Sequence, residues 1–124
     1  RGGFDSESYA KLINQYSTNE QKAIDLINNS LDKDNTQQLA SIAESESIWS
    51  ENMALSSKML TFKLLPPSLK TYTDLLYSYS SYRRLEMSSL IAYDKSQNSD
   101  DYNTLYNAKS RSEEVLREIK QYEK

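Results

Sequence analysis

The stretch PPSLKTYTDLLYSYSSYRRLEMSSLIAYDK, residues 66–95, decides the fold of this chain. It opens with Pro66 and Pro67 and contains no other proline and no glycine. Proline fits the first turn of a helix, whereas the residue before a proline is disfavoured in one. The stretch therefore predicts one long helix over 67–95. Apolar side chains recur on one face of that helix at spacings of three and four: Leu69, Tyr72, Leu75, Leu76, Tyr79, Met87 and Leu90.

The rest of the chain also predicts helices, because its 124 residues include only two glycines and two prolines. Thr36 and Ser99 are the predicted N-caps of the second and fourth helices. The turns between helices are short, so successive helices should be antiparallel. We expect an all-α fold, an antiparallel up-down-up-down four-helix bundle, in a single domain over 1–124. The alternative is two long hairpins that complete a core only by dimerising. The predicted helices cover about 6–29, 36–63, 67–95 and 99–123.

The composition argues against several classes of function. The chain has no histidine and no cysteine, which removes the commonest general base, the commonest metal ligand and any thiol nucleophile. Two glycines cannot build a phosphate-binding loop or a nucleophile elbow. The net charge is −3 with both signs interspersed, so there is no basic face for nucleic acid. We therefore expect no catalytic, cofactor or metal site, and no nucleic-acid partner.

Four charged residues are predicted to face the interior of the bundle. A step of 100° per residue places each of them on, or in line with, the apolar face of its helix. They would form a buried ionic layer that sets helix register, at some cost in stability. Two other interpretations stay open: the side chains reach the rim of the bundle, or the carboxylates bind a cation. The residues of this inward-facing ionic layer are Glu20, Glu46, Arg83 and Glu86.

The second helix carries a second apolar strip on its other side, formed by Ile48, Leu55, Met59 and Phe62. A surface helix of a monomer normally has one apolar stripe. The strip is the candidate interface for a protein partner or a second copy of the chain. The alternative is that two neighbouring helices flank the second helix and cover both sides. Four tyrosines are predicted on or beside the edges of the third helix, mostly as core lining with their hydroxyls at the rim: Tyr77, Tyr93, Tyr102 and Tyr106. A tyrosine-rich surface of this kind could also recognise a protein or a sugar.

The segment Leu64-Leu65-Pro66-Pro67-Ser68-Leu69-Lys70, followed by a long helix rich in Tyr, Ser and Leu, resembles the extracytoplasmic part of small helical lipoproteins of Gram-positive bacteria. The resemblance implies a location outside the cytoplasm, with a lipid anchor on a removed N-terminal part. No apolar run in the chain approaches the ~18–20 residues of a membrane span. We expect a non-enzymatic, exported bundle that binds a protein or itself. The alternatives are a cytosolic regulatory or immunity-type bundle, and a carboxylate-lined bundle that binds a cation.

Overall fold

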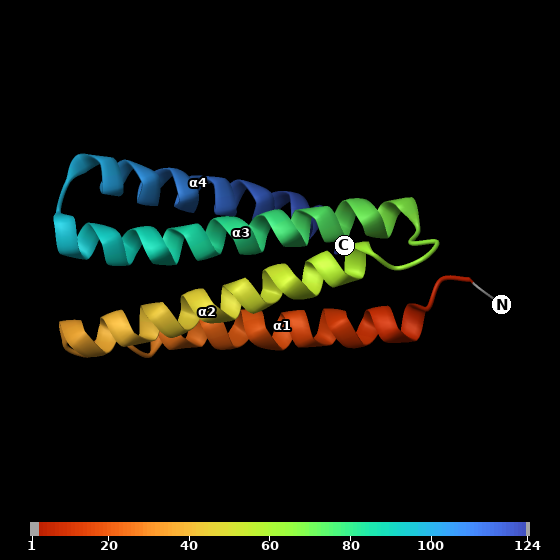
Figure 1. The fold of residues 1–124 in the computed structure, drawn as a ribbon, viewed down its shortest axis with the longest axis horizontal. Coiled ribbons are helices and arrows are strands. Elements are labelled where there is room, and N and C mark those ends of the chain that lie inside the picture. Colours follow the sequence, from red (N-terminus) through yellow and green to blue (C-terminus); the bar gives the residue numbers. More distant parts are fainter. Residues whose placement is uncertain (1–2, 124) are drawn as a thin grey trace.

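A computed structural model describes residues 3–123, and this part of the chain folds into four helices with no strand (Figure 1). The helices run antiparallel in sequence order, which confirms the predicted all-α four-helix bundle. Their bounds are α1 Ser6–Asn28, α2 Asn35–Leu60, α3 Pro67–Ser96 and α4 Ser99–Tyr122.

The helix ends follow local capping chemistry. Asp5 caps α1 by accepting a hydrogen bond from the backbone N–H of Ser8, and Pro67 begins α3 as predicted. The predicted caps of α2 and α4 were each placed too late. Asp34 and Asn98 are the actual N-caps, and each accepts a hydrogen bond from a backbone N–H three residues further on. A carboxylate or amide oxygen caps at least as well as a hydroxyl, so these earlier residues begin the helices.

The second helix ends at Leu60, three residues before the predicted end at 63. The residues that follow form a connection in which Leu64 has a φ of 56° and is largely exposed. Such a left-handed residue does not occur inside a helix. The turn to α3 is therefore longer than the sequence pattern suggested.

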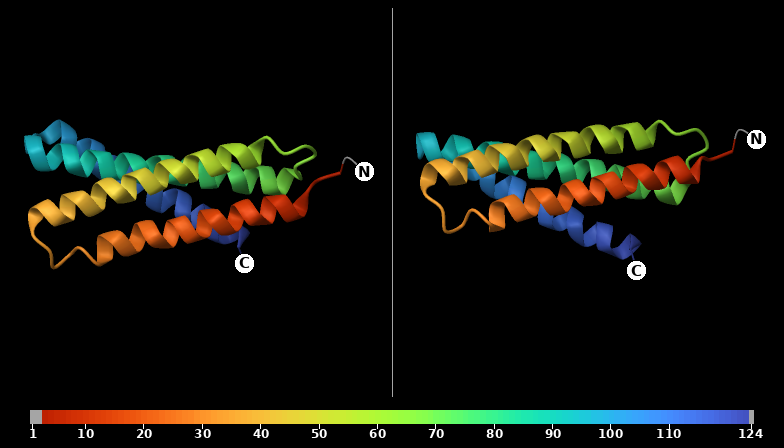
Figure 2. Two further views of the ribbon diagram at one scale, coloured as in Figure 1. Left: turned by 60° about the horizontal axis from the view of Figure 1, so that its bottom comes forward. Right: turned by 90° about the horizontal axis from the view of Figure 1, so that it is seen from below.

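Each helix packs against its neighbours in sequence, but α1 and α4 do not close the bundle. Within residues 3–123, no Cα atom of α1 lies within 8 Å of a Cα atom of α4. Figure 2 shows α4 running at an angle to α1 and α2. The backbones of α1 and α4 are therefore not in direct contact.

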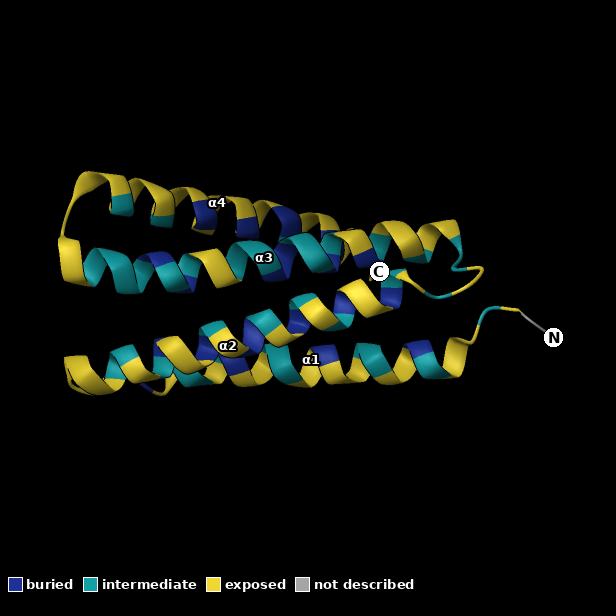
Figure 3. Ribbon diagram, viewed as in Figure 1, coloured by how far each residue is buried: buried dark blue, intermediate teal, exposed yellow. Residues whose placement is uncertain are grey.

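Buried positions lie on all four helices, and most of them are on α2 and α3 (Figure 3). Trp49 is 0% exposed, and its ring meets that of Tyr79 edge to face at 5.4 Å between centroids. Aromatic pairs in this geometry are favourable beyond the area that they bury. The same core cluster contains these other buried side chains: Tyr9, Tyr16, Ala23, Ile42, Ile48, Met59, Leu76, Met87, Val115 and Ile119.

The contact between α1 and α2 includes several buried polar side chains. Asn52 donates a hydrogen bond to the backbone carbonyl of Tyr16 at 3.2 Å, and Asn19 donates to the side-chain oxygen of Asn52 at 3.1 Å. Ser45 donates to the carbonyl of Ala23 at 3.1 Å. Because these buried groups are satisfied, small residues can bring the two backbones together without the cost of a lost hydrogen bond.

Two tyrosine hydroxyls tie α1 to α3. Thr73 donates its only hydroxyl proton to the carbonyl of Leu69, so Tyr9 is the donor in its 2.7 Å bond to Thr73. The Tyr16 hydroxyl lies 2.7 Å from both the carbonyl of Leu76 and the hydroxyl of Ser80. These bonds fix the position of α1 along α3.

Candidate functional site

The apolar strip predicted as a partner interface lies inside the bundle. Ile48 is 6% exposed and Met59 is 0% exposed, so neither offers a surface to a partner. Leu55 and Phe62 are half-buried against the core. The physical reason is that α2 is flanked by α1 on one side and α3 on the other, as the alternative interpretation held. This correction removes Ile48 and Met59 from the surface and leaves Leu55 and Phe62 partly exposed, so the four residues do not form a free docking strip.

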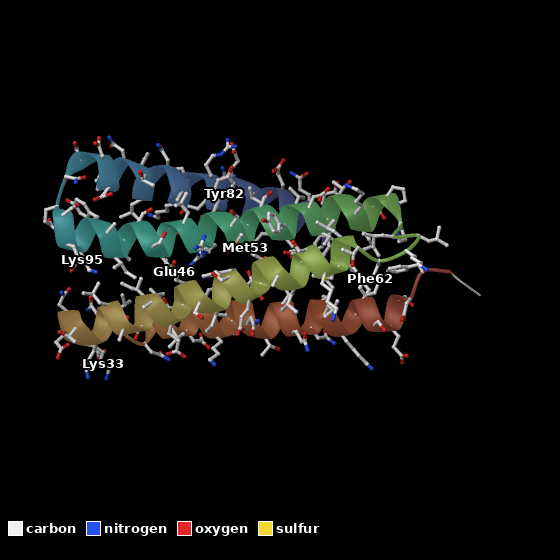
Figure 4. All side chains as sticks on the ribbon, in the orientation of Figure 1. Lys33, Glu46, Met53, Phe62, Tyr82 and Lys95 are labelled. Carbon is white, nitrogen blue, oxygen red and sulfur yellow. The ribbon has the colours of Figure 1, made fainter. Side chains whose placement is uncertain are left out.

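Phe62 illustrates how the strip is covered. Its ring centroid lies 5.9 Å from that of Tyr9 and 6.3 Å from that of Phe4. Figure 4 labels Phe62 near the start of the connection between α2 and α3. The segment before α1 folds over this end of the strip and completes an aromatic cluster.

The four residues of the predicted ionic layer are separated in the structure: two of them pair with each other, one pairs with a residue outside the layer, and one makes no ion pair among the described residues. The Nε atom of Arg83 lies 3.4 Å from a carboxylate oxygen of Glu86, and both side chains are mostly buried. Glu46 faces α3, but its partner is Arg84 at 3.9 Å and not Arg83 (Figure 4). Glu20 makes no ion pair within residues 3–123. The four residues therefore do not form one continuous layer.

Arg83 lies against the central aromatic pair. Its guanidinium carbon is 5.0 Å from the ring centroid of Trp49 and 5.8 Å from that of Tyr79, and it donates a hydrogen bond to the Tyr79 hydroxyl at 3.2 Å. The Nε1–H of Trp49 has no acceptor among the described residues. Stacking on aromatic faces stabilises a guanidinium that is out of water. Arg83 is thus part of the core as well as half of an ion pair.

Glu20 lies instead in a cavity between α1, α3 and α4, here called the α1–α3–α4 cavity. Its volume is about 160 Å³. Tyr72 donates a hydrogen bond from its hydroxyl to a carboxylate oxygen of Glu123 at 2.9 Å, which holds that carboxylate beside the cavity. The lining residues are Ile13, Tyr16, Ser17, Glu20, Tyr72, Leu76, Tyr79, Leu116, Ile119, Lys120 and Glu123.

Sequence reasoning placed Glu20, Tyr72 and Tyr79 on inward faces but did not bring Lys120 or Glu123 to the same place. Lys120 lies in the last turn of α4 and Glu123 directly after it, and both are exposed, so helical periodicity alone gives no indication that they line a cavity. The antiparallel register of α3 and α4 was the signal that could have found Glu123, because it places the end of α4 beside the start of α3.

Burial is the main cause of the pKa shifts of the Glu20 and Glu86 carboxylates. Burial and then the Glu123 carboxylate raise the pKa of Glu20 above its ordinary value of 4.5, and Arg83 opposes the shift. Burial also raises the pKa of Glu86, opposed by Arg83 and Lys109. Both groups therefore bind protons more tightly in the folded state than in the unfolded state.

We expect Glu20→Gln to raise the melting midpoint at pH 7 by a few degrees. A carboxylate with a raised pKa destabilises the fold once it is ionised, and it does so less as the pH falls from the raised pKa towards 4.5. The difference between the variant and the parent should therefore shrink over that interval. Thermal melts at several pH values between 7 and 4 measure it.

Glu118→Gln is the matched control, because Glu118 is exposed on α4. Its melting midpoint should follow that of the parent chain at every pH. A Glu20→Gln advantage that does not depend on pH would contradict the assignment of Glu20 as a carboxylate with a raised pKa.

A second feature of the surface is a tyrosine ladder at the turn between α3 and α4, formed by Tyr93, Tyr102 and Tyr106. The ring centroids of Tyr93 and Tyr102 are 5.5 Å apart, and those of Tyr102 and Tyr106 are 6.5 Å apart in a stacked arrangement. Tyr102 is 48% exposed and Tyr106 is 59% exposed. The ladder is a contiguous aromatic surface, and the sequence had placed these tyrosines at the edge of the bundle.

The described residues contain no group of three acidic side chains placed to hold a metal ion. None of their helices combines the length and the apolar character that a membrane crossing requires. Comparisons of the chain with protein-family models, curated proteins and solved structures give no match.

Proposed function

We propose that this chain is a non-enzymatic helical bundle that acts by binding a protein partner, and that the tyrosine ladder is its contact surface. The single observation that supports the proposal is the contiguous set of rings at Tyr93, Tyr102 and Tyr106, in which the exposed Tyr102 and Tyr106 are stacked and the half-buried Tyr93 packs at a tilt against Tyr102. Tyrosine is enriched at protein interfaces and at their energetic hot spots. Contiguous exposed aromatic surface on a small domain typically marks an interaction site.

The ladder suits this role because its rings are already ordered. Tyr93 is half-buried, and its ring packs at a tilt against that of Tyr102, which in turn stacks with Tyr106. A tyrosine side chain has few rotatable bonds, and stacking restricts them before a partner arrives. Less entropy is then lost on binding.

The proposal that the chain is not an enzyme has its support in composition. The absence of histidine and cysteine leaves carboxylates, tyrosines and lysines as the acid–base groups. Among the half-buried carboxylates, Glu86 and Glu46 are held in ion pairs, and Glu20 lies in the small α1–α3–α4 cavity.

We also propose an extracytoplasmic location, with a lipid anchor supplied by a preceding segment. The support is the resemblance of the region around Pro66 and Pro67 to small helical lipoproteins. The codons upstream of Arg1 test this proposal. A leader that ends in a lipidated cysteine supports it, and an initiating methionine immediately upstream would favour the cytosolic, regulatory alternative.

We expect Tyr102→Ser combined with Tyr106→Ser to abolish partner binding without unfolding the chain. A photocrosslinking amino acid at position 106 should capture the partner in the source cell, whereas the same group at position 122 should not. Tyr122 is the matched control, because it is 47% exposed on the same helix at its opposite end. The purified partner should then bind the double variant at least ten times more weakly than the parent, and Tyr122→Ser as well as the parent.

Equal binding by the double variant and the parent would overturn the ladder as the contact surface. Light scattering over a range of concentrations separates a partner from self-association. A dimer that the double variant converts to a monomer would make a second copy of the chain the occupant of the ladder.

A further inference from the structure

We propose that the α1–α3–α4 cavity binds a small organic cation, of the alkylammonium or quaternary ammonium class. This site is distinct from the tyrosine ladder and does not depend on the proposed function. The cavity has a volume of about 160 Å³ and combines carboxylate and aromatic walls.

The charges around the cavity leave a place for one positive charge. Glu20 and Glu123 contribute two carboxylates, and Lys120 contributes one ammonium. Lys120 is exposed, and within residues 3–123 it makes no ion pair with either carboxylate. A single bound cation would neutralise the remaining negative charge.

The nearby Arg83 is already engaged elsewhere. It pairs with Glu86 at 3.4 Å, lies over Trp49 and donates a hydrogen bond to the Tyr79 hydroxyl. Glu20 has no hydrogen-bond or ion-pair partner within the described residues, whereas Glu123 accepts only the Tyr72 hydroxyl at 2.9 Å. The half-buried Glu20 carboxylate is therefore the strongest acceptor in the cavity that is still free to bind a ligand.

The walls favour an organic cation over a metal ion. Tyr16, Tyr72 and Tyr79 line the cavity, and tyrosine rings attract ammonium groups electrostatically. Hard divalent ions require about six or more oxygen ligands, and the described residues offer no group of three acidic ligands. A cavity of this volume is comparable to one that accommodates benzene, so it suits a cation of about five to seven non-hydrogen atoms.

Access to the cavity is a consequence of the open side of the bundle. The Cα atoms of α1 and α4 stay more than 8 Å apart at every described pair, so no backbone contact between these two helices closes the cavity. Lys120 and Glu123 are the charged and exposed residues of the cavity lining. A small ligand could enter without any helix moving.

The test compares tert-butylammonium chloride with tert-butanol, which has nearly the same shape and no charge. A titration followed by two-dimensional NMR of the backbone amides reports both affinity and place. We expect the cation to bind at least ten times more tightly than the alcohol, with shifts confined to residues around Glu20, Tyr72 and Leu116. The cation should also raise the melting midpoint, because it binds only the folded state.

Three variants make the assignment specific. Glu20→Gln should weaken cation binding at least tenfold, and it should fold, since it removes a destabilising carboxylate. Lys120→Ala should strengthen binding, because it removes the competing ammonium. Glu118→Gln, at an exposed position of α4, should bind like the parent. Equal affinity for the cation and the alcohol, or unchanged cation binding by Glu20→Gln, would overturn the proposal.

Discussion

Replacing Trp49 with alanine is expected to destabilise the fold by about 3–5 kcal/mol. The indole is 0% exposed, it packs edge to face with Tyr79, and it supports the guanidinium of Arg83 at 5.0 Å. Removal of the side chain leaves a large cavity where α2 and α3 meet. Urea denaturation measures the loss as a lower midpoint with an unchanged slope.

Trp49→Phe separates the ring from the indole N–H. The N–H has no acceptor among the described residues, so its removal relieves an unpaired buried donor while a ring still faces Tyr79. We expect Trp49→Phe to lower the free energy of unfolding by less than half as much as Trp49→Ala. Leu31→Ala is the control, because Leu31 is 71% exposed, and it should change stability by no more than ~0.5 kcal/mol. Equal losses of stability for Leu31→Ala and Trp49→Ala would contradict the packing of Trp49 in the core.

Arg83→Ala is expected to cost about 2–3 kcal/mol, somewhat less than the loss of one partner of a fully buried ion pair. The Arg83 side chain is 20% exposed, which moderates the effect. Three contacts are lost together: the pair with Glu86, the stacking on Trp49 and the hydrogen bond to the Tyr79 hydroxyl. Chemical denaturation at pH 7 gives the free-energy difference.

The neighbouring arginine provides the matched control. Arg84 is 48% exposed and lies 3.9 Å from Glu46, so Arg84→Ala should cost no more than ~0.5 kcal/mol. Adding Glu86→Gln to Arg83→Ala should recover part of the loss, because it removes the carboxylate left unpaired. Similar losses for the two arginines would show that burial does not distinguish them.

The two proposed sites lie at different places on the α3–α4 hairpin. The tyrosine ladder is next to the turn between the helices, and the α1–α3–α4 cavity is near the start of α3 and the end of α4. Variants of one site should leave the other unaffected, since separated positions act additively. The ladder variants should therefore still bind tert-butylammonium, and Glu20→Gln should still bind the protein partner.

The sequence by itself determined the helical class and the order of the helices. Few residues of the chain can break a helix, and Pro67 marks the start of α3 without ambiguity. Periodicity also placed Trp49 and Tyr79 inside. These properties are local, because capping, propensity and the spacing of apolar side chains depend on neighbours within a few residues.

Only the tertiary structure decided what lies next to each helical face. The second strip of α2 became core, because α1 packs over it through the small residues Ser45 and Asn52. Glu46 paired with Arg84, and Glu20 was left in a cavity beside Glu123. Helical periodicity gives the direction of a side chain but not the identity of the helix that it meets. The candidate sites follow from how the helices pair, and above all from the separation of α1 and α4 that leaves one side of the bundle open.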